Sequence, residues 1–264
     1  MAYLNIDLTS LPQRQSGNCI CYTLNTKREY LNEKEWKHHD GSPASNDAKI
    51  RQWTFGKEIE NKINKTILLA GETGTGKTTL IHTMVNYMLG VKFEDKVWFE
   101  LAEEEEKGQT LSKTLAVTVY KIHIEEQESS FTIIDTPGYG DTQSEDNGEA
   151  IAENLSELFE SYGKIERIDT VGLVVKSSAN RLTKSQRYIF DSILSLFGKD
   201  IEDNIVLLIT HSDGLPPTNA IDAVKMANAR CAKGDDGEPT HFLFNSRQLA
   251  LGDGFPVAGE SKIY

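Results

Sequence analysis

Residues 71–78 have the types and the spacing of a phosphate-binding loop. They read GETGTGKT and fit the pattern G-x-x-x-x-G-K-[ST]. Glycines let backbone N–H groups face phosphate oxygens without clashes from a Cβ atom. We expect Lys77 to reach the β- and γ-phosphates of a nucleotide and the Thr78 hydroxyl to hold Mg²⁺. The alternative is a glycine-rich turn without a ligand, and the strand and helix predicted beside the loop argue against it.

An aspartate at the end of an apolar segment supplies the second motif. Residues 131–138 read FTIIDTPG, so Asp135 ends a predicted strand. A carboxylate in this position can hold Mg²⁺ through water, and the backbone N–H of Gly138 can contact the γ-phosphate. A phosphate-binding loop followed by D-x-x-G is the motif order of GTP-binding domains, in which the second motif is a switch. A simple strand-to-turn sequence is the alternative.

The third motif concerns the base of the nucleotide. Residues 205–213 read IVLLITHSD, where GTPases carry [NT]-K-x-D at the end of a strand. The Asp213 carboxylate can accept two hydrogen bonds from guanine, whereas adenine offers no such pair of donors. His211 stands at the lysine position, which weakens the motif, and Asp213 could instead cap a turn. We therefore expect guanine, and the alternative is a P-loop ATPase or kinase.

The predicted nucleotide contacts come from the phosphate-binding loop, from the third motif and from the two residues that follow a last predicted strand. They are Gly71, Glu72, Thr73, Gly74, Thr75, Gly76, Lys77, Thr78, Thr79, Thr210, His211, Asp213, Asn245 and Ser246.

Strands and helices must alternate along the chain to position these residues. Apolar runs bounded by turn signals predict strands at 66–70, 115–124, 131–135, 170–176, 204–210 and 240–244. Apolar residues at helical spacing predict helices at 77–89, 149–162, 184–197 and 219–232. The second and third strands are joined by an acidic turn and predict a hairpin. The alternation predicts an α/β fold of the P-loop NTPase class, with a mostly parallel central sheet and helices on both faces.

The chain of 264 residues is long enough for one large domain. We expect an N-terminal extension at 1–60, the nucleotide-binding domain at 61–250 and a C-terminal tail at 251–264. Possible strands in the extension lie at 19–24 and 51–55, and the polar, acidic stretch 93–113 predicts no element.

Composition indicates a soluble protein, with 38% hydrophobic and 26% charged residues. No apolar run approaches the roughly 20 residues of a membrane helix, and the first residues do not resemble a signal peptide. Three cysteines suggest a reducing compartment, so we expect a cytoplasmic protein. The net charge of −12 and the lack of a basic stripe with interleaved aromatics argue against nucleic acid as a partner.

The segments GETGTGKTTL, TIIDTPGYGD and THSD together resemble the septin-like branch of P-loop GTPases. This branch includes septins, immunity-associated GTPases and chloroplast import receptor GTPases, and a histidine at the lysine position resembles the latter two groups. NYMLGVKFEDKVWF and YIFDSILSLFGKD also resemble uncharacterised animal septin-type G-domain proteins. The resemblance covers residues 65–246. It implies binding of GTP and GDP with Mg²⁺ and, in many members, dimerisation with a second copy or a related G domain across the nucleotide face.

The resemblance also implies a switch threonine that completes the Mg²⁺ ligands. Thr114, just before the predicted strand 115–124, is the best candidate to join Thr78 and Asp135, and Thr110 is the alternative. A threonine that only begins a strand would look the same.

The predicted chemistry is hydrolysis of GTP with Lys77, Thr114 and Gly138 as the catalytic groups. Small GTPases carry a glutamine after this glycine to orient the attacking water, whereas this chain has Tyr139. We therefore expect slow hydrolysis that a partner subunit can stimulate, in a switch or an assembly module. A scaffold that keeps its nucleotide without hydrolysing it is a further alternative.

Overall fold

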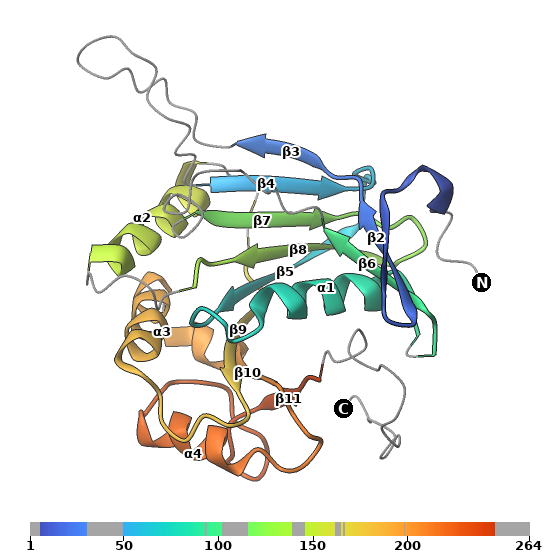
Figure 1. Cartoon of the computed structure of the whole chain (residues 1–264). Helices are drawn as coiled ribbons and strands as arrows, with labels where there is room; N and C mark the ends of the chain where they lie inside the picture. Colours follow the sequence, from blue (N-terminus) through green and yellow to red (C-terminus); the bar gives the residue numbers. More distant parts are fainter. Residues whose placement is uncertain are drawn as a thin grey trace, which may run out of the picture.

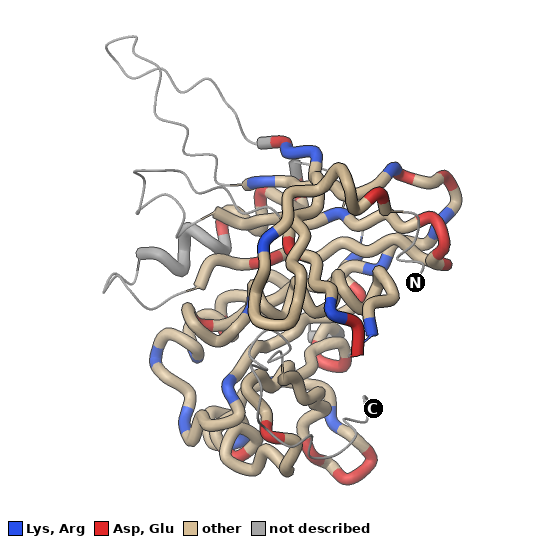
Figure 2. The backbone as a smooth tube through the Cα atoms, turned by 45° about the vertical axis from the view of Figure 1, so that its right-hand side comes forward, with Lys and Arg blue, Asp and Glu red and all other residues tan. Residues whose placement is uncertain are grey.

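The computed structural model describes residues 6–30, 50–92, 94–101, 116–138, 146–161, 165, 167–197 and 199–245. The predicted site residues Thr110, Thr114, Tyr139 and Ser246 lie outside these ranges, as does the predicted tail. Lys and Arg are interspersed with Asp and Glu over the described backbone (Figure 2).

A mixed sheet of eight strands forms the centre of the protein (Figure 1). Its strands are β3 (Lys27–Tyr30), β4 (Ile50–Phe55), β5 (Ile63–Ala70), β7 (Val117–Ile122), β8 (Ser129–Asp135), β9 (Thr170–Lys176), β10 (Ile205–Thr210) and β11 (His241–Leu243). Their order is β11-β10-β9-β5-β8-β7-β4-β3. Neighbouring strands are parallel except for the β7–β8 and β3–β4 pairs. The mostly parallel sheet and the predicted hairpin are therefore confirmed.

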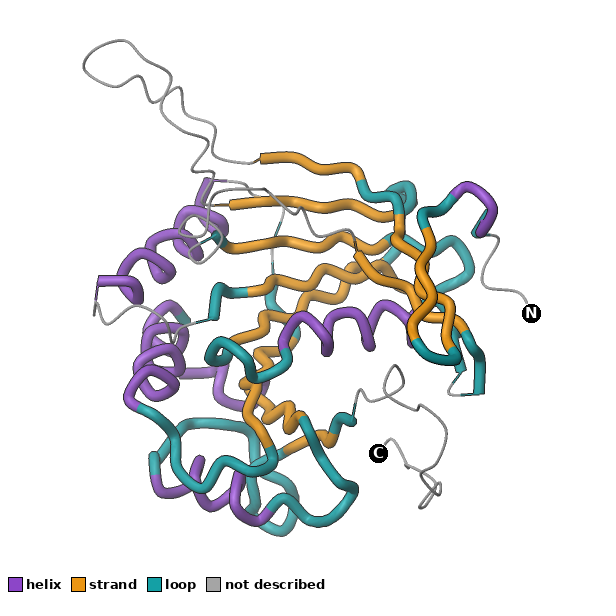
Figure 3. Tube along the Cα trace, in the orientation of Figure 1, coloured by secondary structure: helices purple, strands orange, loops and turns teal. Residues whose placement is uncertain are grey.

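Helices and a second, smaller sheet cover the two faces of the central sheet (Figure 3). One face packs against α2 (Asp146–Ser161), α3 (Lys184–Leu196) and α4 (Thr218–Met226). The other face packs against α1 (Lys77–Met88) and against the β2 and β6 strands of the smaller sheet. That sheet has the order β1-β2-β6, with β1 (Gln13–Ser16), β2 (Cys19–Leu24) and β6 (Val97–Leu101). Two 3₁₀ turns complete the described elements, η1 (Leu8–Ser10) and η3 (Lys199–Asn204).

The strand β5 shows why these residues form a central strand. It pairs in parallel with β8 on one side and with β9 on the other. Leu68 and Ala70 point into the core beneath α2 and α3, while Leu69 points to the core beneath α1, and all three are fully buried. A strand that is buried on both faces needs a continuous apolar run, which is what residues 67–70 provide.

The structure corrects two predicted elements. The stretch 93–113 contains β6, in which the buried Phe99 and Leu101 face the core although the surrounding sequence is acidic. The last helix was expected to reach residue 232, yet α4 ends at Met226. Asn228 adopts a left-handed φ of 52°, and Ala232 donates its N–H to the carbonyl of Ile205, so the chain has already turned back to the sheet.

Strands from the predicted N-terminal extension are part of both sheets. The segment expected at 19–24 forms β2, and the segment expected at 51–55 forms most of β4. Because β4 and β3 extend the central sheet beyond β7, that sheet begins upstream of residue 61, where the predicted nucleotide-binding domain starts.

Side-chain hydrogen bonds tie together the end of the sheet at which β5 begins. Lys62 donates from Nζ to the carbonyls of Ile124, Glu125 and Gln127 at 2.9, 2.6 and 2.6 Å. Gln127 donates from Nε2 to the carbonyl of Met88, the last residue of α1, at 2.8 Å. The β7–β8 turn is thereby joined to both β5 and α1 at the end opposite the phosphate-binding loop.

Candidate nucleotide site

The loop between β5 and α1 is shaped by two glycine positions. A Cβ atom on Gly71 would lie 2.7 Å from the carbonyl oxygen of Val174, so a side chain does not fit there. Gly76 caps the N-terminus of α1 with a φ of 91°, which a residue with a Cβ atom rarely adopts. The first N–H groups of a helix have no acceptor within it, so the loop presents donors and the positive end of the α1 dipole.

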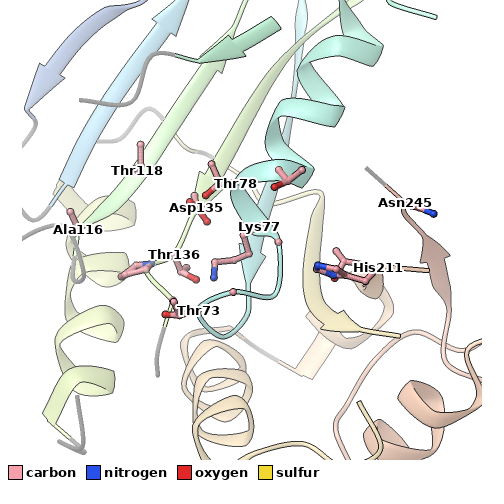
Figure 4. Close-up of a pocket in the computed structure, with 15 residues that line it drawn as sticks. Thr73, Lys77, Thr78, Ala116, Thr118, Asp135, Thr136, His211 and Asn245 are labelled. Carbon is pink, nitrogen blue, oxygen red and sulfur yellow. The ribbon is translucent and has the colours of Figure 1, made fainter. Parts of the chain in front are cut away.

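A cavity of about 670 Å³ lies in front of this loop (Figure 4). The predicted residues that line it are Thr73, Gly74, Gly76, Lys77, Thr78, Thr79, Asp135, Gly138, Thr210, His211 and Asn245. Four lining residues were not predicted, namely Ala116, Thr118, Thr136 and Pro137. The cavity thus brings together all three sequence motifs.

The Lys77 side chain lies inside the loop from which it comes. Its Nζ atom donates to the carbonyl of Gly71 at 2.6 Å and to that of Glu72 at 3.3 Å, and the residue is 8% exposed. Burial lowers the pKa of this ammonium, while the charges of Asp135 and Glu72 act in the opposite direction. A buried cation beside a cavity with backbone donors is suited to binding an anionic ligand.

Thr78 and Asp135 provide oxygen atoms close to Lys77. Figure 4 shows the three side chains in the same part of the cavity, from the start of α1 and the end of β8. No group of three or more His, Cys, Asp and Glu side chains suited to a metal occurs within the described ranges. Mg²⁺ usually keeps several waters and takes one or two carboxylates from the protein, so a hydroxyl and a carboxylate fit this ion.

Threonine hydroxyls hold the loop from within. Thr75 donates from Oγ1 to the carbonyl of Glu72 at 2.8 Å, and Thr210 donates from Oγ1 to the carbonyl of Thr75 at 2.6 Å. Thr75 and Thr210 are 3% and 5% exposed. The hydroxyls of these two predicted nucleotide contacts are therefore used to join the loop to itself and to the end of β10.

The second motif lies directly against the phosphate-binding loop. A Cβ atom on Gly138 would be 2.6 Å from Oγ1 and 2.8 Å from the backbone N of Thr73. Thr136, which the sequence analysis missed, donates from Oγ1 to the carbonyl of Leu69 at 2.9 Å. The segment after Asp135 is thus attached to β5 and reaches the loop at a position where only glycine fits.

The third motif is only partly at the cavity. His211 lines it with a left-handed φ of 56°, and its carbonyl accepts a hydrogen bond from Ser177 Oγ at 2.8 Å. Asp213 is exposed and does not line the cavity, and its Oδ1 accepts the N–H of Leu215 at 3.0 Å. The structure therefore places His211 and Asn245 together at the cavity and Asp213 in a neighbouring turn.

The lining residue Thr118 lies at the start of β7, and Ala116 directly precedes that strand. The antiparallel register places Thr118 directly opposite Asp135, the last residue of β8. A hairpin always brings the start of its first strand beside the end of its second, so the predicted hairpin could have indicated these residues.

Comparison with known proteins identifies similar sequences. A family model described as Septin matches residues 61–170. Septin-5 of Macaca fascicularis is 26% identical over 235 residues, which cover 78% of this chain and 57% of the relative. Septin-4 of Homo sapiens is 30% identical over 113 residues, which cover 42% of this chain and 22% of the relative. The chain therefore spans only part of the length of the relatives that it matches.

Solved structures also match, at low sequence identity. Toc33 from Arabidopsis thaliana, in complex with Mg²⁺ and GMPPNP, has 18% sequence identity and a TM-score of 0.45, with 70% of this chain and 72% of the other covered. A probable GTP-binding protein, engB, has 17% identity and a TM-score of 0.42 over 69% of this chain and 89% of the other.

Within the described part of the chain, no helix has the length and apolarity required to cross a membrane. The Septin match over 61–170, together with the septin-5 and septin-4 relatives, confirms the predicted resemblance of this chain to the septin-like branch of P-loop GTPases.

Proposed function

We propose that the protein binds GTP and GDP with Mg²⁺ and hydrolyses GTP slowly, as a switch or a nucleotide-controlled assembly module. The observation that carries the proposal is the cavity in which Lys77, Thr78, Asp135 and Gly138 meet. These four residues come from two separate motifs, at the carboxyl ends of the neighbouring parallel strands β5 and β8. Ligands of open α/β sheets bind at this edge.

In this proposal each group has one task. The loop N–H groups and Lys77 bind the phosphates, and Lys77 exchanges the carbonyls of Gly71 and Glu72 for phosphate oxygens. Thr78 and Asp135 hold Mg²⁺, together with Thr114. Bound Mg²⁺ neutralises charge on the β- and γ-phosphates. The Gly138 N–H detects the γ-phosphate, and its closeness to Thr73 supports this role.

Hydrolysis is slow in this proposal because, among the described residues of the cavity, none matches the glutamine that orients water in small GTPases. The described residues that line the cavity include neither Gln nor Glu, and Tyr139 takes the place of the usual glutamine. A second G domain across the nucleotide face would supply the stimulating group, as the family resemblance implies. We propose a cytoplasmic location because the few cysteines suggest a reducing compartment.

Guanine is the proposed base, contacted by His211, Asn245 and Asp213. In the turn at Asp213, the Oδ1 atom accepts the N–H of Leu215. This hydrogen bond holds the backbone of Asp213, which lies two positions after His211. The carboxylate must move or rotate toward the cavity to bind the N1 and 2-amino groups of guanine, so nucleotide binding should rearrange this turn.

Calorimetric titration of nucleotide-free protein with GDP and ADP, with and without Mg²⁺, tests the proposal. We expect tight, Mg²⁺-dependent binding of GDP and negligible binding of ADP. Equal binding of ADP would instead support an ATPase. Lys77→Ala should abolish triphosphate binding, and unchanged affinity would contradict the assignment of the loop.

The base assignment has its own test. Asp213→Asn should weaken GTP binding and favour xanthosine nucleotides, because an amide matches the changed N1 and C2 edge of xanthine. Retention of full GTP affinity would show that Asp213 is a structural residue of the turn.

The assembly role is tested by light scattering of the full chain. The apparent mass should be higher with a GTP analogue than with GDP if the nucleotide face forms a dimer. An equal mass in both states would leave a monomeric switch.

A further inference from the structure

We propose that Thr183, at the N-terminus of α3, is a positioning residue for the phosphate-binding loop and acts through the carboxylate of Glu72. The inference rests on the proposed nucleotide binding and adds to it a residue from outside the three motifs. Thr183 is the N-cap residue of α3 and is exposed, and it is not among the residues that line the cavity.

Two hydrogen bonds meet at the Thr183 hydroxyl. Its oxygen accepts the backbone N–H of Gln186 at 3.1 Å, which caps the helix. Its hydrogen is donated to Oε1 of Glu72 at 3.1 Å, because an ionised carboxylate can only accept. Gln186 completes the capping box by accepting the Thr183 N–H at 2.9 Å. The helix therefore needs the oxygen of Thr183, and Glu72 needs its hydrogen, so the two functions can be separated by substitution.

The backbone of Glu72 is hydrogen-bonded to two other residues of the loop. Its backbone carbonyl accepts hydrogen bonds from Thr75 Oγ1 at 2.8 Å and from Lys77 Nζ at 3.3 Å. Its negative charge also acts on Lys77, where it opposes the lowering of the pKa by burial. A carboxylate whose charge acts on Lys77 would compete with phosphate oxygens for the same ammonium when it is not held elsewhere.

The contact with Thr183 gives the carboxylate another partner. At the N-terminus of α3 a negative charge is favoured by the helix dipole as well as by the hydroxyl. Glu72 does not line the cavity, whereas the next residue, Thr73, does. Thr183 thus holds the Glu72 carboxylate on α3 and leaves the loop N–H groups and Lys77 to the phosphates.

The deciding substitution is Thr183→Asp in the full chain. Aspartate caps a helix about as well as threonine, so α3 should remain stable. The aspartate cannot donate a hydrogen bond to Glu72 and repels its carboxylate. GDP with Mg²⁺ should therefore bind about 5–10-fold more weakly, where a factor of ten corresponds to about 1.4 kcal/mol of binding free energy. The loss should diminish at high salt, since repulsion between exposed charges is screened. Thr183→Ser keeps both hydrogen bonds and should bind GDP like the wild type.

Two further variants separate positioning from other causes. Ser185→Asp adds the same charge to the first turn of α3 without removing the Thr183 hydroxyl, and it should leave GDP affinity nearly unchanged. Adding Glu72→Gln to Thr183→Asp should restore most of the affinity, because the neutral amide neither repels the aspartate nor competes for Lys77.

The outcomes distinguish this inference from the proposed function. Wild-type affinity in Thr183→Asp, an equal loss in Ser185→Asp, or no recovery on adding Glu72→Gln would each overturn the role of Thr183. A wild-type protein that binds no GDP would instead overturn the proposed function itself. Urea unfolding of each variant without nucleotide measures whether the α3 cap is intact. Loss of the positioning role alone should not change this stability.

Discussion

Replacing Thr210 with valine should weaken both the fold and the nucleotide site. Valine has the shape of threonine but no hydroxyl, so the substitution removes the 2.6 Å hydrogen bond to the carbonyl of Thr75. Thr210 and Thr75 are both almost completely buried, so water cannot replace the lost donor. The loop would then lose its attachment to the end of β10.

The size of the effect follows from this burial. Leaving a buried acceptor without its donor costs about 1–3 kcal/mol. A loss of about 2 kcal/mol lowers Tm by about 4–8 °C in a domain of about 150–250 residues. Affinity for GDP should fall as well, because Thr75 precedes Gly76 and Lys77 in the loop.

Urea unfolding with and without GDP and Mg²⁺ measures both effects, and Thr210→Ser is the matched control because it keeps the hydroxyl. Thr210→Ser also loses one buried methyl group, so it should be about 1 kcal/mol less stable than the wild type, and Thr210→Val should lose about 2 kcal/mol in both conditions. A Thr210→Val protein with the unfolding midpoints of the wild type would refute the reasoning, since valine differs from threonine at this site only in the hydroxyl.

Two further predictions concern the sheet that carries the loop. Gly172→Ala would place a Cβ atom 2.4 Å from Cδ1 of Leu208, so it should destabilise the protein by about 1–3 kcal/mol in urea unfolding, with partial recovery when Leu208→Val is added. Burial opposes ionisation of Asp169, but hydrogen bonds from the Thr66 N–H and the Arg167 guanidinium outweigh it and hold the pKa of this carboxyl below its usual value. The resulting stability is present above about pH 4 and is lost as the pH falls through the lowered pKa, so Asp169→Asn should lose less stability than the wild type between about pH 5 and pH 2. An equally steep acid decline in Asp169→Asn would contradict this assignment.

The sequence predicted the parts of the fold in which local pattern and tertiary environment agree. The run 67–70 is apolar because both faces of β5 are covered, and the loop residues 71–78 join a strand to a helix in the way their glycines require. The same agreement holds at the start of α3, which the apolar spacing placed at Lys184 and which the capping box of Thr183 and Gln186 stabilises in the structure.

The remaining features depend on partners that are distant in the chain. β6 is covered by α1 and paired with β2, and neither neighbour can be inferred from its five residues. The sequence left two roles open for Asp213, base reading and a turn cap, and only the structure shows the turn contact between its Oδ1 and the N–H of Leu215. The contact between Glu72 and Thr183 joins residues 111 positions apart, so no spacing in the sequence could have revealed it.

The hydrogen bonds of Lys62 and Gln127 make the β7–β8 turn a suitable place to attach a fluorescent label. All three cysteines of the chain, Cys19, Cys21 and Cys231, are buried. A thiol-reactive dye would therefore react first with a cysteine introduced at the exposed Glu125, whose backbone is held by Lys62. A fluorophore attached by Glu125→Cys would be a stationary reference, and energy transfer between it and a fluorescent nucleotide would report movements at the cavity.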